Sequence, residues 1–394
     1  VKKIEEIFKS DTLDIEVAIK KNKIYIFQCR ELVVKERKNY DKEIETALKN
    51  LEKKIDKLKK PNPFVSGKTT YFSNMSDWNP AEMIGSKPKN LSISLYSELI
   101  TNNIWAEQRK GYGYKDVIPN PLMVNFAGSP YIDLRTDFNS FLPAGLDKKK
   151  ENKIVNNSLY KIKKKPELHD KIEFKCIENS YDFNSKVIKA DYLDKNYLLK
   201  LKKITEDCIK NSSKINKELN SLSQLDIKIN IIKNSKLSDI QKIYYLIHNC
   251  KYYGTLPFAG IARLAFIATR FLRSMLNLKL INQNEYEMFY QYSDSISNII
   301  KKDLIKLKNK KITKQKFLFK YGHLRPQTYS ITSKNYREAF NKYFSLSDEI
   351  KIIKNKKLFF RKKLFDKIDK QIKKHNLKFS NKELVSFIIK SIHY

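Results

Sequence analysis

The chain opens with residues in which hydrophobic and polar side chains alternate. Residues 13–19, LDIEVAI, place two acids on one side and apolar residues on the other, which is the period of a β-strand. A KKNK turn follows, and residues 24–30, IYIFQCR, alternate again with Gln28 and Arg30 on one face. The pattern predicts a β-hairpin with one polar face.

The next periodic stretch, residues 38–60, has the spacing of an amphipathic helix with a narrow apolar seam. Its apolar positions are Ile44, Leu48, Leu51, Ile55 and Leu58. Pro61 and Pro63 follow directly, and the composition changes after them. Helix breakers beside such a change favour a domain boundary here.

Residues 71–143 combine short helical and extended patterns. Asn79 precedes Pro80, so we expect Asn79 to cap a helix that begins at the proline. Residues 94–109, SLYSELITNNIWAEQR, predict a second helix, and Gly128 opens a turn before YIDLR, which predicts a strand. Asp133 and Arg135 would then share one strand face.

The remainder of the chain has mostly helical periodicity. Residues 258–276 predict a core helix opened by Gly254 and Pro257, and residues 199–235 and 343–394 predict Lys-rich or basic helices. We therefore expect an α+β fold that is mainly α: a hairpin, then a largely helical middle domain with a few strands near residues 121–135.

The formal net charge of +36 raises the question of a nucleic-acid partner. Most of the excess is Lys spread along helical segments, and no nucleic-acid-binding motif accompanies it. We interpret the charge as solvated helix faces and nucleic acid as an unlikely partner. Four separated cysteines without CxxC spacing favour reduced thiols in a cytoplasmic protein. Arginines interrupt the apolar run 261–276, so we expect no membrane partner.

The aromatic-rich block 71–143 is the best candidate for a substrate pocket. If the substrate is an amino acid, its α-carboxylate needs a guanidinium group and its α-ammonium needs a carboxylate. An amide side chain of the substrate would also need a hydrogen-bond donor and an acceptor. The candidates are Asp77, Trp78, Asn79, Glu82, Arg109, Asp133, Arg135 and Asn139, with His323 and Arg325 from a later loop. Simpler roles stay open: Asp77, Asn79 and Glu82 as a helix cap, Asp133 with Arg135 as an ion pair, and the His323 loop as an ordinary turn.

The polar face of the hairpin is a candidate nucleotide site. Asp14 and Glu16 are hard oxygen ligands of the kind that Mg²⁺ prefers, and Gln28 and Arg30 could contact phosphates. An exposed charged hairpin without a ligand is the alternative. Two further residues stand out without an assigned role: His169, in the string HDKIEF, and Arg263, beside an apolar helix stripe.

The hairpin string DIEVAI…IYIFQCR resembles the end of the ATP-grasp domain of phosphoenolpyruvate synthases and pyruvate phosphate dikinases. The resemblance implies that Glu16 binds the metal and that Gln28 and Arg30 contact ATP. Glu31 replaces the proline that is usual in the family after the residue matching Arg30.

The strings SDWNPAEMIG, PYIDLRTDFNSFLP and GHLRPQTY resemble a subset of these proteins associated with surface polysaccharides, and similar proteins also carry an HDK-E-F string. Some resemble L-glutamine kinase of capsule phosphoramidate biosynthesis. This implies an ATP- and Mg²⁺-dependent phosphotransferase that makes AMP and phosphate and passes a phosphoryl group through a phosphohistidine to a small acceptor, glutamine or pyruvate.

We therefore expect a fragment of a longer enzyme, inactive alone. Its parts would be the end of an ATP-grasp domain (1–35), a helical linker (36–63), a substrate-binding middle domain (64–342) and a basic helical tail (343–394) leading to an absent phosphohistidine domain. No histidine here has the expected Gly-rich context, so no catalytic residue is assigned. The alternative is a non-enzymatic basic module that binds nucleic acid or another polyanion.

Overall fold

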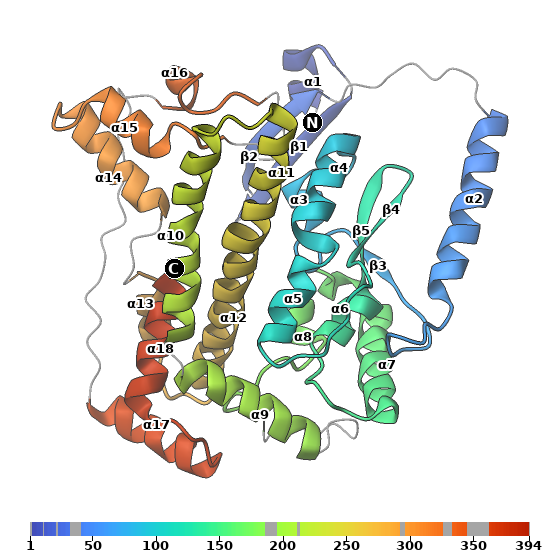
Figure 1. The fold of residues 1–394 in the computed structure, drawn as a ribbon, viewed down its shortest axis with the longest axis vertical. Coiled ribbons are helices and arrows are strands. Elements are labelled where there is room, and N and C mark those ends of the chain that lie inside the picture. Colours follow the sequence, from blue (N-terminus) through green and yellow to red (C-terminus); the bar gives the residue numbers. More distant parts are fainter. Residues whose placement is uncertain are drawn as a thin grey trace. The chain divides into compact units, whose positions relative to one another are not determined.

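A computed structural model describes residues 2–10, 12–20, 23–31, 41–185, 195–210, 213–291, 296–325, 333–344 and 362–393 (Figure 1). The chain divides into two compact units, Val1–Lys54 and Ile55–Tyr394. The described residues are mainly helical with two small sheets, as predicted.

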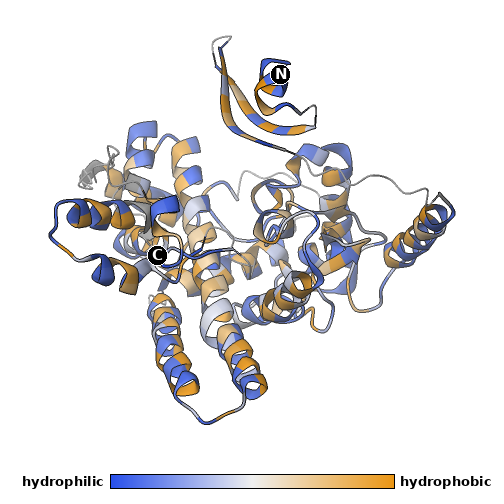
Figure 2. Cartoon of the chain, turned by 90° about the horizontal axis from the view of Figure 1, so that it is seen from above, coloured by the Kyte–Doolittle hydropathy of each residue, from blue (hydrophilic) through white to orange (hydrophobic). Residues whose placement is uncertain are grey.

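The first unit contains the predicted hairpin. A short helix, α1 (Lys2–Phe8), precedes β1 (Leu13–Lys20) and β2 (Lys23–Glu31), which pair antiparallel. Asp14 lies opposite Arg30 and Glu16 opposite Gln28, and an irregularity follows Glu16. The alternation is visible as bands of hydrophobic and hydrophilic residues along the hairpin (Figure 2). The prediction of a two-stranded hairpin with this polar pairing is confirmed.

The predicted amphipathic helix is α2 (Asp41–Lys59), which ends before Pro61. Its last turns belong to the second unit, where Arg135 donates hydrogen bonds to the carbonyl oxygens of Leu58 (2.9 Å) and Lys60 (2.7 Å). These two bonds pair carbonyl groups at the helix end that have no partner within the helix.

A three-stranded antiparallel sheet of order β3-β5-β4 lies in the second unit: β3 (Phe72–Ser73), β4 (Met123–Phe126) and β5 (Ser129–Asp133). The strands near residues 121–135 are thereby confirmed, but the strand expected through Arg135 is wrong. Helix α6 (Leu134–Ser140) begins after Asp133, whose carboxylate accepts a hydrogen bond from Thr136 N at 3.1 Å. An N-cap therefore ends the strand two residues early.

The helix predicted over residues 94–109 is divided. Helix α4 (Asn90–Tyr96) continues into a π-helical turn, η1 (Ser97–Thr101), and α5 (Ile104–Gly111) follows after Asn103. The cap at Asn79 is confirmed: its side chain accepts from Glu82 N, and α3 (Pro80–Met83) begins at the proline.

The remaining helices of the second unit follow in order. They are α7 (Lys148–Lys164), η2 (Pro166–Leu168), α8 (Ile172–Lys175), α9 (Lys195–Lys210), α10 (Ser213–Lys233), α11 (Asp239–Asn249), η3 (Cys250–Thr255), α12 (Leu256–Asn277), α13 (Gln283–Gln291), α14 (Ile296–Lys308), α15 (Lys314–Tyr321), α16 (Phe340–Tyr343), α17 (Lys362–Lys374) and α18 (Asn381–His393). The core helix predicted at 258–276 does not start afresh, because the π-helical turn η3 joins α11 to α12.

Helix α12 runs through the main core and packs against α5, α10 and α18 (Figure 1). Leu264, Phe271 and Leu272 of α12 are fully buried, and residues of α17 and α18 belong to the same hydrophobic cluster. Among the described helices, the continuous segment Asp239–Asn277 is long and apolar enough to cross a membrane. Of its most apolar window, 61% is buried inside the protein, as in a core helix.

Candidate functional site

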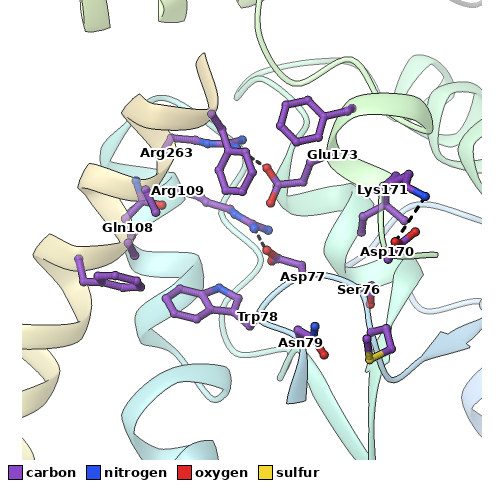
Figure 3. Close-up of a pocket in the computed structure, with 17 residues that line it drawn as sticks. Ser76, Asp77, Trp78, Asn79, Gln108, Arg109, Asp170, Lys171, Glu173 and Arg263 are labelled. Carbon is purple, nitrogen blue, oxygen red and sulfur yellow. Dashed lines mark hydrogen bonds and ion pairs between the residues drawn. The ribbon is translucent and has the colours of Figure 1, made fainter. Parts of the chain in front are cut away.

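A cavity of about 410 Å³ lies where the loop 75–79, α5, α8 and α12 meet (Figure 3). Its aromatic walls are paired rings: Trp78 with Phe258, at 6.0 Å between centroids, and Phe174 with Phe266, at 5.4 Å. Polar groups from all four segments also line it. We call it the Trp78 cavity, defined by Met75, Ser76, Asp77, Trp78, Asn79, Gln108, Arg109, Asp170, Lys171, Ile172, Glu173, Phe174, Phe258, Ala259, Ala262, Arg263 and Phe266.

The loop that carries Asp77 and Trp78 has an unusual backbone. Trp78 and Asn79 both have positive φ, at 60° and 32°, a region that bulky residues seldom adopt. The hydroxyl of Tyr96 donates to the Trp78 carbonyl oxygen, and Asn79 caps α3, so both sides of the turn are fixed. Backbone strain held by surrounding contacts is typical of functional sites.

Arg109 is the central cation beneath this loop. Its guanidinium donates to Asp77 and to Asp137, the latter at 3.1 Å, and stacks on the Phe141 ring at 3.9 Å. Burial alone would lower the pKa of Arg109, but the carboxylates of Asp77 and Asp137 raise it above its ordinary value. Arg109 is therefore a permanent buried cation.

A second buried pair joins two segments far apart in sequence. Arg263 of α12 donates to the Glu173 carboxylate of α8, and both side chains are almost fully buried. Burial raises the pKa of Glu173 to about 7; Arg263 and Arg109 oppose this increase, and Asp77 adds to it. Because Asp77 and Glu173 face each other in the cavity, the two pairs act as one electrostatic group (Figure 3).

The group contains more acid than base. Three carboxyl groups, those of Asp77, Asp137 and Glu173, share two guanidinium groups. Burial raises the pKa of Asp137 well above its ordinary value, and the nearby Asp77 adds to the rise. Since buried charge without compensation is costly, the site favours an additional proton or cation.

Three buried polar atoms of the lining residues have no hydrogen-bond partner among the described residues: Gln108 Nε2, Ser76 Oγ and Arg263 Nη1. Ser76 and Gln108 are 5% exposed, and Arg263 is 3% exposed. Buried donors are normally paired with protein, water or ligand. In this cavity, water or a ligand with hydrogen-bond acceptors can supply that partner.

Four of the candidate substrate residues lie together in this cavity: Asp77, Trp78, Asn79 and Arg109. Glu82 does not line it; its side chain accepts a hydrogen bond from the Asn79 amide within the cap of α3. Glu82 therefore has the alternative role of a helix-cap residue, whereas Asp77 pairs with Arg109 and is not part of the cap.

Asp133, Arg135 and Asn139 also lie outside the lining residues and have structural partners. Asp133 accepts from Thr70 Oγ1 at 2.7 Å, and Arg135 holds the end of α2. Asn139 binds the backbone of Ser66, accepting from its N–H at 2.8 Å and donating to its carbonyl at 2.7 Å. Asp133 and Arg135 do not pair with each other in any described ion pair.

His323 and Arg325 follow α15, beside a separate small hydrophobic cluster centred on Phe317 and Phe340, and they do not line the Trp78 cavity. The rest of their motif, residues 326–329, lies outside the described residues. His169 shares a hydrogen bond of 3.3 Å with Ser73 Oγ.

The hairpin candidates lie in the first unit. Arg30 donates to Asp14 at 2.7 Å, in a pair that is more than one-third exposed on each side, and Glu16 is beside Gln28 in the register. Among the described residues, no group of three or more His, Cys, Asp or Glu side chains is placed to hold a metal ion. The assignment of Asp14 and Glu16 to Mg²⁺ stays a prediction, since one or two carboxylates together with phosphates and water can hold this ion.

The sequence interpretation left out several members of the site, namely Gln108, Asp137, Glu173 and Phe258. In the sequence, Arg263 stands out beside an apolar helix stripe and HDKIEF for its histidine, and no pattern connects the two. The signal was present, since a charged residue on an apolar helix face requires an opposite charge elsewhere.

Comparison with known protein families, curated protein sequences and solved structures found no match to this chain. The function proposed below consequently depends on the site and on the sequence motifs.

Proposed function

We propose that this chain takes part in ATP-dependent phosphoryl transfer in the cytoplasm and that the Trp78 cavity binds the small acceptor. The observation that carries the proposal is a cavity of about 410 Å³ in which aromatic walls enclose buried carboxylate–guanidinium pairs. Such a site suits a compact molecule with both positive and negative groups. L-glutamine is the leading candidate, and pyruvate and other amino acids are alternatives.

The motifs that resemble phosphoenolpyruvate-synthase-like proteins support this assignment by their positions. SDWNPAEMIG contributes Asp77, Trp78 and Asn79 to the cavity, and HDKIEF contributes Glu173. The PYIDLRTDFNSFLP segment contributes Asp137, which pairs with Arg109 behind the cavity wall. Segments almost a hundred residues apart thus meet around one small-molecule site.

In the proposed reaction, the phosphoryl donor is a phosphohistidine on a domain outside these residues. The role of this cavity is to orient the acceptor and to exclude water, since positioning and charge neutralisation supply most of the catalysis in phosphoryl transfer. The first unit would contribute Asp14, Glu16, Gln28 and Arg30 to an ATP–Mg²⁺ site completed by other residues. We expect this chain alone to bind Mg-ATP weakly.

Calorimetric titration tests the acceptor assignment. Glutamine, other amino acids, pyruvate and sugars are titrated against the wild type, Trp78→Ala and Asp77→Asn, with Glu82→Gln as control because it lies in the same segment outside the lining. We expect one ligand class to bind to the wild type. The two cavity variants should lower the affinity for that ligand by roughly ten- to a hundredfold. Equal binding to all four proteins would contradict the proposal.

The net charge of +36 favours one other function, a basic module for nucleic acid or another polyanion. Binding of this kind weakens steeply as salt rises, because phosphate contacts release counterions. A filter-binding titration between low and physiological salt separates the two: tight, salt-sensitive binding of nucleic acid, together with no small-molecule binding, would favour the polyanion module.

A further inference from the structure

The carboxyl groups of Asp77 and Glu173 face each other in the cavity. The ion pairs of the cavity do not explain how the repulsion between these two groups is balanced. Each has its own guanidinium, Arg109 behind Asp77 and Arg263 behind Glu173 (Figure 3). Both carboxyl groups are directed into the same part of the cavity (Figure 3), and the negative charge of Asp77 adds to the raised pKa of Glu173. Two carboxylates in such a position repel each other unless a proton or a cation lies between them.

The surrounding charges do not remove this repulsion. Arg109 is shared with a third acid, Asp137, and the remaining charged pair of the lining, Asp170 with Lys171 at 3.5 Å, is largely self-compensating. The charged groups that face the pair come from five segments: Asp77 from the loop, Arg109 from α5, Asp137 from α6, Asp170, Lys171 and Glu173 around α8, and Arg263 from α12. Together they leave one negative charge in excess.

An independent observation points to a ligand with acceptor atoms as well. The amide nitrogen of Gln108 is buried in the cavity wall without a partner among the described residues, and so is the hydroxyl of Ser76. A ligand that satisfies both features has a cationic group for the acids and an oxygen for Gln108. The aromatic rings of Trp78 and Phe258 would cover its carbon chain.

We propose that Asp77 and Glu173 form a cation subsite that binds the primary ammonium group of a small amino-acid-like ligand. The ammonium group replaces one proton that the two acids share in the empty site. Gln108 donates a hydrogen bond to an oxygen of the same ligand. The displaced proton leaves to solvent, so the charge of the site is unchanged. The inference rests on the proposed function for the ligand class and adds Glu173 and Gln108 as specificity-determining residues. It also excludes pyruvate, which has no ammonium group.

The test compares L-glutamine with glutaramic acid, which lacks only the α-ammonium, by calorimetry of the wild-type chain in two buffers of different ionisation enthalpy. With the pKa of Glu173 near 7, we expect glutamine binding at pH 6 to release close to one proton, and we expect the affinity to rise about fivefold between pH 6 and pH 7. Above pH 8 the release should disappear. Glutaramic acid should bind at least tenfold more weakly and release no proton.

Three variants locate the effect. Glu173→Gln should abolish proton release and weaken glutamine at least tenfold, and Gln108→Ala should weaken binding while the proton release persists. Asp116→Asn is the control, since it makes the same carboxyl-to-amide change at an exposed residue that pairs with Lys110 outside the lining. If Glu173→Gln does not fold, the two-buffer measurement on the wild type still decides.

The outcomes separate this inference from the proposed function. Equal binding of glutamine and glutaramic acid, or binding without proton release at pH 6, overturns the cation subsite and leaves the acceptor site intact. Proton-linked binding of another primary ammonium compound, such as a different amino acid, supports the subsite and overturns glutamine as the acceptor. If no ammonium compound in the panel binds, the subsite is wrong.

Discussion

Replacing Arg109 with methionine should destabilise the second unit strongly. Arg109 is 5% exposed, pairs with Asp77 and Asp137 and stacks on Phe141. Methionine keeps much of the packing volume but leaves two buried carboxyl groups without their cation. Removing one partner of a buried ion pair costs about 3–5 kcal/mol, so we expect a loss of free energy of unfolding in this range.

Urea unfolding followed by tryptophan fluorescence measures the effect, because both tryptophans, Trp78 and Trp105, lie in the second unit and Trp105 is 5.2 Å from the Arg109 guanidinium. Lys110→Met is the control: the next residue of the same helix pairs with Asp116 at an exposed position and should have little effect. Adding Asp137→Asn to Arg109→Met should restore part of the stability. Similar small effects of Arg109→Met and Lys110→Met would refute the reasoning.

Three further predictions concern stability. Glu173 keeps its proton up to about pH 7 in the folded protein but loses it near pH 4.5 in the unfolded chain. Its contribution to the free energy of unfolding is therefore fully present below pH 4.5 and is lost as the pH rises to 7. Urea midpoints of the wild type should show this decline with pH, and those of Glu173→Gln should not. Arg135→Ala removes both hydrogen bonds to the end of α2, and hydrogen exchange of residues 55–60 should accelerate, whereas Lys148→Ala, which loses only an exposed bond to Pro63 O, should leave it unchanged. Gly67→Ala should destabilise by about 1–3 kcal/mol in the urea assay, because φ is +117° and a Cβ would lie 2.9 Å from Val155; an unchanged midpoint would contradict this.

Features set by near neighbours in sequence were predictable. The cap at Asn79 with Pro80, the α2 helix and the β-hairpin each depend on residues within a few positions, and all are present. YIDLR shows the limit of this approach. Five alternating residues fit a strand, but the Asp133 side chain can also accept hydrogen bonds from the next turn, and the cap prevails at Asp133.

The site itself was only half predictable, for a physical reason. Asp77, Trp78 and Arg109 come from one unusual block, so composition alone marks them. Glu173 and Arg263 are ninety residues apart, and their pairing depends on how α12 packs beside α8. A sequence pattern indicates that a buried arginine needs an acid, but packing decides which acid it meets.

The π-helical turn η3, between α11 and α12, determines which way the cavity side chains of α12 point. A π turn contains one residue more than an α-helical turn, so every side chain beyond it is rotated by about 100° relative to an uninterrupted helix. Six residues, Cys250–Thr255, thus set the angular position of Phe258 and Arg263 around the helix axis. Removal of a single residue from this turn would point Arg263 away from Glu173 while α12 remained an intact helix.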